Sequence, residues 1–289
     1  MGNYKEILRL IKVRFFERSI AFVYATVIGT FVASKGIPDI RLLFYALLVI
    51  FCLAVGTYIF NDVQDHEVDR INKVDRPIAI GSVTRKQGLI VSIILFSFGL
   101  MLSALINLET LLTSLVITAL GILYSVPPIR LRNRFLIVNI VRSSGGFLSS
   151  LLGGAVIGNI SPQIIFQGFM FFMLIFSGTP IFDLPDLMGD KVGRSKSLSI
   201  VYGPKFGIKF SIAGWSVLTV LAILSFPYFG FNVITPIMLT SLLLIHIWLA
   251  YSLLSRWRDV NYCRDVCKKI IHLGFFYQLS FLLGVLPLF

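Results

Sequence analysis

The sequence predicts an all-α membrane protein whose chain crosses the bilayer about nine times. Of its 289 residues, 56% are hydrophobic and only 14% are charged, whereas soluble domains carry about 25% charged residues. Long uncharged runs recur along the chain, and each approaches the ~20 residues that a helix needs to cross ~30 Å of hydrocarbon. The runs are continuous rather than alternating, which favours helices over a barrel. This composition excludes a disordered chain and most water-soluble enzymes.

The predicted spans together form one transmembrane domain over residues 1–289, a bundle with a central cavity. They cover residues 19–34, 42–60, 88–106, 110–124, 136–157, 163–182, 206–226, 231–254 and 270–289. The first run could be a signal peptide. We retain it as a span because no small-x-small cleavage site precedes Lys35 and further spans follow.

The basic residues predict the orientation of these spans. With the N-terminus in the cytoplasm, 23 of the 26 Lys and Arg residues lie in inner segments. The outer loops hold only Lys35 and Arg41, and Arg142 lies within the fifth span. This asymmetry predicts a cytoplasmic N-terminus and an outer C-terminus. Anionic lipid attracts basic inner loops, so the net charge of +12 requires no nucleic-acid partner.

Two acidic motifs follow the second and sixth spans, on the predicted inner side. In the first, Asn61, Asp65 and Asp69 fall at about 0°, 40° and 80° around a helix, on one face. In the second, Asp183, Asp186 and Asp190 would also share a face if the segment is helical.

Pro180 and Pro185 favour a break or kink in the second motif. Asp65 and Asp186 are separated by 121 residues, as are Asp69 and Asp190. We therefore consider an internal duplication of four-helix units as a hypothesis.

Carboxylates gathered at a membrane boundary repel one another and need a cation. Oxygen ligands without a nearby His or Cys set favour Mg²⁺, which prefers to be shared with substrate phosphates. Basic side chains that could bind such phosphates follow each motif, namely Lys73, Arg76 and Lys196. The alternative is a pair of solvated loops of mixed charge that only set topology, which two matched motifs make less favourable.

These residues carry a resemblance to a known family. Asn61-Asp62-x-x-Asp65-x-x-x-Asp69-Arg70 resembles the first signature of the UbiA family of intramembrane prenyltransferases. The segment 124–132, Tyr-Ser-Val-Pro-Pro-Ile-Arg-Leu-Arg, is similar to the family's loop after the fourth span, and 183–198 resembles its second signature. Order, spacing and membrane context agree from about residue 10 to 210.

The resemblance implies that an allylic prenyl diphosphate is bound through Mg²⁺ between the two motifs, near the cytoplasmic side. The implied metal ligands are Asn61, Asp65, Asp69, Asp183, Asp186 and Asp190, and the catalytic carboxylates are Asp65, Asp69, Asp186 and Asp190. Tyr124 and Arg130 would border the diphosphate and the prenyl cavity. The implied reaction moves a prenyl group to a lipophilic acceptor, an aromatic ring or a glyceryl ether lipid, and releases pyrophosphate.

Two other functions remain open. A terpene cyclase of the same family would use the same metal site, with the substrate's own double bond in place of the acceptor. A secondary transporter with paired acidic gates is a remote alternative, since acids at one rim and an odd helix count differ from an inverted repeat. Membrane lipid is an expected partner, and no obligatory protein partner is evident.

Arg142 and the cysteines are further candidates. A charge within a span usually faces the bundle interior, so Arg142 could contact diphosphate or pair with an acid; it could also snorkel to the inner boundary. Cys263, Cys267 and His272 have helical spacing, but we interpret them as incidental rather than as a metal site.

Overall fold

The computed structural model describes residues 2–71, 75–187 and 197–287, and in these ranges every regular element is a helix. The N-terminal half contains α1 (Gly2–Arg14), the π-helical turn η1 (Phe15–Ser19), α2 (Ile20–Ser34), α3 (Ile40–Ile71), α4 (Arg85–Ile106) and α5 (Leu108–Ser125). The remainder contains η2 (Leu131–Asn133), α6 (Ile137–Ile157), α7 (Pro162–Phe182), η3 (Leu184–Asp186), α9 (Leu198–Val201), α10 (Pro204–Phe229), α11 (Ile234–Arg256) and α12 (Val260–Val285). Within the described ranges, nine helical segments are long and apolar enough to cross a membrane. The prediction of an all-α protein with about nine spans is confirmed.

Two helices extend well beyond the predicted spans. α3 continues to Ile71 rather than ending near residue 60, and α12 begins at Val260 rather than at residue 270. Both extensions carry charged residues, which end a hydrophobic run without ending a helix. Hydropathy therefore marks the apolar part of a helix, while the helix itself continues into the polar region.

The chain divides into two compact units. Unit 1 comprises 1–30, 38–131 and 148–159, and unit 2 comprises 31–37, 132–147 and 160–289. The single domain and the internal duplication expected from the sequence stay predictions.

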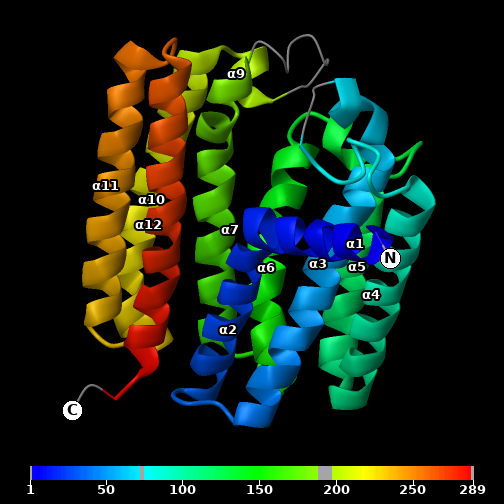
Figure 1. The fold of residues 1–289 in the computed structure, drawn as a ribbon. Helices are drawn as coiled ribbons and strands as arrows, with labels where there is room; N and C mark the ends of the chain where they lie inside the picture. The colour runs from blue at the N-terminus through cyan, green and yellow to red at the C-terminus, as the bar shows by residue number, and fades with distance from the viewer. Residues whose placement is uncertain (1, 72–74, 188–196, 288–289) are drawn as a thin grey trace. The chain divides into compact units, whose positions relative to one another are not determined.

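In unit 1, α3 packs against α4, α5, η1 and α1 (Figure 1). Leu10 of α1 is fully buried in the same apolar cluster as Val55 and Ile59 of α3. α2 and α6 approach closely, because a Cβ on Gly153 would lie 2.4 Å from the carbonyl oxygen of Thr26. The hydroxyl of Thr26 donates to the carbonyl of Ser149 at 2.9 Å, as is typical of small residues between membrane helices.

In unit 2, α10 packs against α7 and α11, and α12 packs against α11 and α7 (Figure 1). The buried indole of Trp215 in α10 donates to the carbonyl of Leu174 in α7. Gln167 of α7 donates to Gln278 of α12, and both side chains are buried. Because lipid offers no partner for such groups, these bonds join the helices specifically.

Candidate active site

The first acidic motif lies on the last turns of α3. Because α3 stays helical to Ile71, Asn61, Asp65 and Asp69 occupy one face, as predicted. Asp65 is buried, and the amide nitrogen of Asn61 donates to the hydroxyl of Ser125 on α5 at 3.0 Å. That bond orients the Asn61 amide, so its oxygen is the atom turned away from Ser125.

An arginine contacts each of the two carboxylates. Arg76 donates to Asp69 with 2.9 Å between Nη1 and Oδ2. Arg130 donates to Asp65 with 3.4 Å between Nη2 and Oδ1. Both arginines were predicted to contact a diphosphate, and the structure places each beside a predicted metal ligand. Tyr124 lies in the last turn of α5, next to the Ser125 that orients Asn61.

Asp62 has a different role, which the sequence did not reveal. It lies about 100° around α3 from Asn61, and its carboxylate is paired with the guanidinium of Arg14 at the end of α1. The side chains of Arg14 and Asp62 are 2% and 1% exposed. Arg76 lies 3.7 Å from the same carboxylate, between Asp62 and Asp69. Its angle around α3 separates Asp62 from the predicted metal ligands, but no local pattern indicates a partner 48 residues earlier.

The second motif lies in unit 2, and its local structure differs from a continuous helix. α7 ends at Phe182, and Leu184–Asp186 form a 3₁₀ turn. The expected break near Pro180 and Pro185 is confirmed, and Asp183 and Asp186 do not lie on one continuous α-helix. Of the motif's other predicted residues, Asp186 is described in its backbone only, and Asp190 and Lys196 lie outside the described residues, as does Lys73 of the first motif.

Arg142 of α6 pairs with the second motif. Its Nη1 donates to Oδ1 of Asp183 at 3.4 Å, which confirms the pairing with an acid as one of the roles expected for it. Arg132 lies in the turn before α6, where burial and the charge of Arg142 lower its pKa. An anion bound close to both arginines would reduce their mutual repulsion. Arg132 belongs to the Arg-Leu-Arg end of the loop motif, from which only Arg130 was predicted as a site residue.

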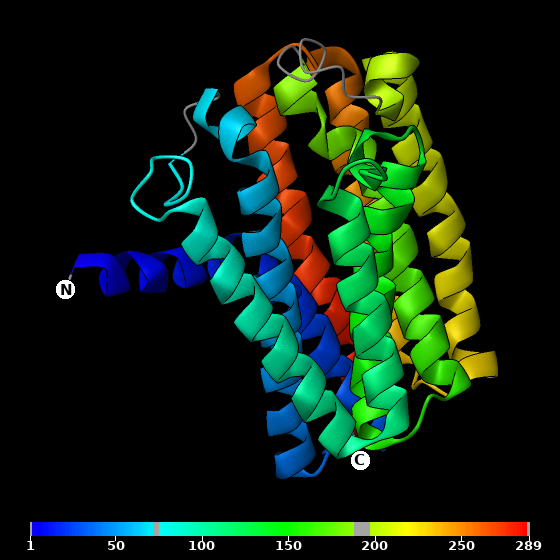
Figure 2. The ribbon, with the colours of Figure 1, turned by 90° about the vertical axis from the view of Figure 1, so that its right-hand side faces the viewer.

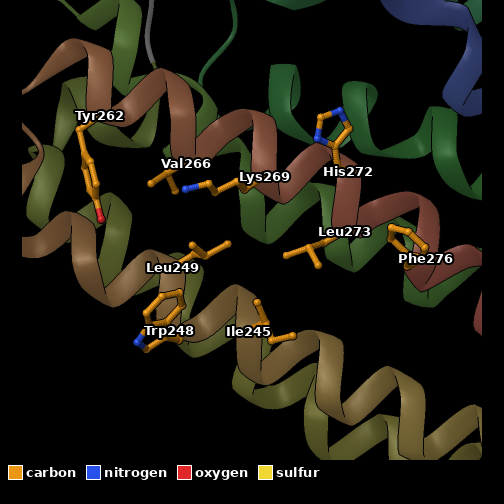
Figure 3. A pocket seen from close by; sticks show the side chains of 9 residues that line it. All are labelled: Ile245, Trp248, Leu249, Tyr262, Val266, Lys269, His272, Leu273 and Phe276. Atoms are coloured by element: carbon orange, nitrogen blue, oxygen red, sulfur yellow. The ribbon is translucent and has the colours of Figure 1, made fainter.

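Two other features lie apart from the acidic motifs. An open groove of about 410 Å³ between α11 and α12 is lined mainly by apolar and aromatic side chains, with Lys269 and His272 (Figure 3). None of the predicted site residues lines it. The thiols of Cys263 and Cys267 contact backbone carbonyls. Among the described residues, no three His, Cys, Asp or Glu side chains gather as a metal site.

A comparison with protein families gives a match to the UbiA prenyltransferase family over residues 22–276. The chain belongs to this family. It is therefore a prenyltransferase and an integral membrane protein, as the sequence motifs indicated.

Similar proteins include digeranylgeranylglyceryl phosphate synthases of archaea. The one from Saccharolobus solfataricus is 28% identical over all of this chain and 99% of its own length. The one from Sulfurisphaera tokodaii is 30% identical over 90% of this chain and 91% of its own length.

Solved structures share the fold. A structure described as giving insights into digeranylgeranylglyceryl phosphate synthase in membranes matches with a TM-score of 0.80 and 24% identity, covering 99% of both chains. A UbiA homologue from Archaeoglobus fulgidus bound to GPP and Mg²⁺ matches with a TM-score of 0.72 and 18% identity, covering 92% of this chain and 98% of that one.

The buried pair of Arg14 and Asp62 predicts an asymmetric response to mutation. Arg14→Met leaves a buried carboxylate with Arg76 as its remaining cation, so we expect destabilisation by about 3 kcal/mol. Arg14→Met with Asp62→Leu removes both charges and should recover most of this loss. Thermal unfolding in detergent measures both effects. Arg18→Met, at an exposed arginine one turn away, is the matched control; equal melting temperatures for Arg14→Met and this control would contradict the assignment.

Proposed function

We propose that the protein transfers a geranylgeranyl group from its diphosphate to a glyceryl phosphate lipid that already carries one such chain. The observation that carries this proposal is the row of polar ligands on α3, in which Asp65 and Asp69 each contact an arginine. Carboxylates and guanidinium groups in alternation are the set that a metal-bound diphosphate requires. The substrate class is supported by similarity over nearly the full chain to synthases named for digeranylgeranylglyceryl phosphate.

The residues of the first motif suit Mg²⁺. Asp65 and Asp69 offer two carboxylates on one helix face, and Asn61 adds an oriented amide oxygen. Mg²⁺ takes one or two carboxylates and completes its octahedron with waters and substrate phosphates, so a larger protein cluster is not needed. When bound, Mg²⁺ would neutralise the diphosphate and favour its departure. We assign the same role to Asp183, Asp186 and Asp190 of the second motif.

The arginines provide the remaining positive charge. Arg76 and Arg130 contact the carboxylates through charge-assisted hydrogen bonds, and a diphosphate presents oxygens of the same kind. We assign to them, and to Arg142 and Arg132, the binding of the diphosphate oxygens. Lys73 and Lys196 are further candidates for this contact. Cations held in place by buried or half-buried acids need little reorganisation when the leaving group develops its charge.

The reaction breaks the bond between C1 of the prenyl chain and the diphosphate oxygen. A new bond forms between C1 and the hydroxyl oxygen of the glyceryl lipid, and the hydroxyl proton leaves to a base or to water. Pyrophosphate carries away the electron pair of the broken bond. The allylic cation that develops at C1 must be shielded from water, which an apolar helix bundle in a membrane provides. The site faces the cytoplasm if the orientation predicted from the basic residues holds.

Neutralising a motif carboxylate tests the metal site. We expect Asp65→Asn and Asp69→Asn each to lower kcat for pyrophosphate release by about 100-fold or more, because charge at the leaving group loses its stabilisation. Release from geranylgeranyl diphosphate and the glyceryl phosphate acceptor is measured in detergent with Mg²⁺. Removing Mg²⁺ with EDTA should abolish release by the wild-type protein.

Glu67→Gln is the matched control, because Glu67 is an exposed carboxylate on α3 about 240° around the helix from Asn61. Its kcat should equal that of the wild type. If Asp65→Asn and Glu67→Gln retain the same activity, the carboxylate face on α3 does not hold the metal.

Removing an arginine tests the diphosphate contact. We expect Arg130→Ala to raise KM for the prenyl diphosphate by about tenfold, the value of one charged hydrogen bond. Arg130→Lys should recover part of this loss, because it retains the charge but not the forked donor. Arg85→Ala removes an equally positive but exposed side chain at the start of α4 and should leave KM unchanged. An unchanged KM in Arg130→Ala would remove Arg130 from the diphosphate site.

The mass of the product separates the remaining functions. A transferase requires the glyceryl lipid and yields a product heavier than it by one geranylgeranyl group. Release of pyrophosphate without acceptor, with a cyclic hydrocarbon as product, would indicate the terpene cyclase instead. Mass spectrometry of extracted lipids, with and without acceptor, distinguishes these outcomes.

A further inference from the structure

The first helix, α1, has two different faces. On one face Leu10 is fully buried, and Ile7 and Ile11 pack with it against the apolar cluster of α3. The other face leaves large apolar side chains uncovered: Tyr4 is 66% exposed and Leu8 is 47% exposed. Phe16, in the π-helical turn that follows, is 59% exposed. Lys5 and Lys12, both exposed, lie beside this uncovered stripe.

α1 does not run in the direction of the spanning helices. Figures 1 and 2 show it directed sideways relative to α3 of the same unit, with its N-terminal end projecting away from that unit's helices. The turn comes at the π-helical residues Phe15–Ser19, although residues 4–34 would otherwise be long enough and apolar enough for one continuous span. A local change of helix type of this kind alters the direction and the facing side chains of a helix. An amphipathic helix directed sideways from membrane spans is typical of a helix that lies in the plane of the bilayer surface.

The charge of this segment suits an anionic surface. Residues 2–19 contain five basic and two acidic residues. Glu6 and Glu17 each contact an arginine of the same segment, whereas Lys5 and Lys12 extend from the helix surface. Basic residues close to an anionic leaflet are attracted to its surface.

The inner face of α1 contacts the first acidic motif and the segment that follows it. Arg14 pairs with Asp62 within the motif. Arg9 donates to Asp75 at 3.0 Å, and the hydroxyl of Ser82 donates to Glu6 at 2.7 Å. One helix therefore holds α3 at the motif and also residues 75–82, from which Arg76 reaches Asp69.

We propose that α1 is an interfacial helix that binds the anionic surface of the bilayer, and that this binding sets the position of the first acidic motif and of residues 75–84. The bilayer is the occupant of the exposed stripe, because aromatic and aliphatic side chains flanked by lysines suit the boundary between headgroups and acyl chains. Arg14 acts as a positioning residue in this arrangement, since it connects the surface helix to α3 through Asp62.

The first experiment measures the depth of α1. A nitroxide at Leu8→Cys is compared with one at Val220→Cys, on the exposed face of the apolar helix α10, and one at Arg258→Cys, in the polar turn before α12. The protein is placed in vesicles of zwitterionic lipid that contain about 30% phosphatidylglycerol, because an anionic surface attracts basic segments. We expect Leu8 to be shielded from an aqueous nickel chelate far more than Arg258 and less than Val220. Accessibility of the Leu8 label equal to that of the Arg258 label would overturn the proposal. Shielding of the Leu8 label that increases with protein concentration would indicate contact with a second copy of the protein and would also overturn it.

The second experiment tests the coupling. Deuterium exchange of residues 75–84 should be slower in the anionic vesicles than in purely zwitterionic ones. Lys5→Glu with Lys12→Glu reverses the exposed charge of α1 and should remove this difference, while also increasing the exposure of the Leu8 label. Lys205→Glu with Lys209→Glu makes the same charge change on exposed positions of α10 and should leave both readouts as in the wild type.

Equal deuterium exchange of residues 75–84 in both lipids for the wild type would show that lipid binding by α1 does not affect this segment, and would overturn the coupling. Equal effects of the two charge reversals would show a general surface effect and would overturn the proposal that α1 binds the anionic bilayer surface. Neither readout requires an active enzyme, so these outcomes are independent of the proposed transferase activity.

Discussion

The structure of the candidate site depends on the pairing of carboxylates with arginines. A carboxylate withdrawn from water costs several kcal/mol unless a counterion and hydrogen bonds compensate it. Asp62 is almost completely buried and meets Arg14, while Asp65 and Asp69 meet Arg130 and Arg76. In unit 2, Asp183 meets Arg142. Each of these acids therefore has a cation in place before any substrate arrives.

These ion pairs differ in burial, and therefore in whether a ligand can replace one partner. Arg14 and Asp62 are both enclosed, so exchange of either partner for a ligand would leave a buried charge. Arg130 and Arg76 are partly exposed, and Asp65 and Asp69 lie on the face that also carries Asn61. The enclosed pair suits a fixed support, whereas the accessible pairs can rearrange around a metal and a diphosphate. The acids on the last turns of α3 thus differ in burial, which suits Asp62 to a structural role and Asp65 and Asp69 to the chemical role proposed for them.

The length of α3 makes this arrangement possible. With 32 residues, α3 is about 48 Å long. This length exceeds the ~30 Å thickness of the hydrocarbon core. The excess carries the motif on a rigid helix rather than on a loop, so the spacing of Asn61, Asp65 and Asp69 becomes a fixed geometry. The capping box at Thr84 and Gln87 starts α4 soon after, and the short segment between the helices contains Arg76.

The sequence by itself determined the class of fold, the family and the first acidic face. Hydropathy identifies spans because only helices or closed barrels satisfy backbone groups in lipid. The four-residue spacing of Asn61, Asp65 and Asp69 is a local property of a helix, so it could be read from the chain alone. The tertiary structure decided the rest. The contacts of Arg14 with Asp62 and of Arg130 with Asp65 join residues 48 or more positions apart. The sideways direction of α1 depends on the π-helical residues Phe15–Ser19. Such contacts follow from the packing of whole helices, which no local pattern of residues encodes.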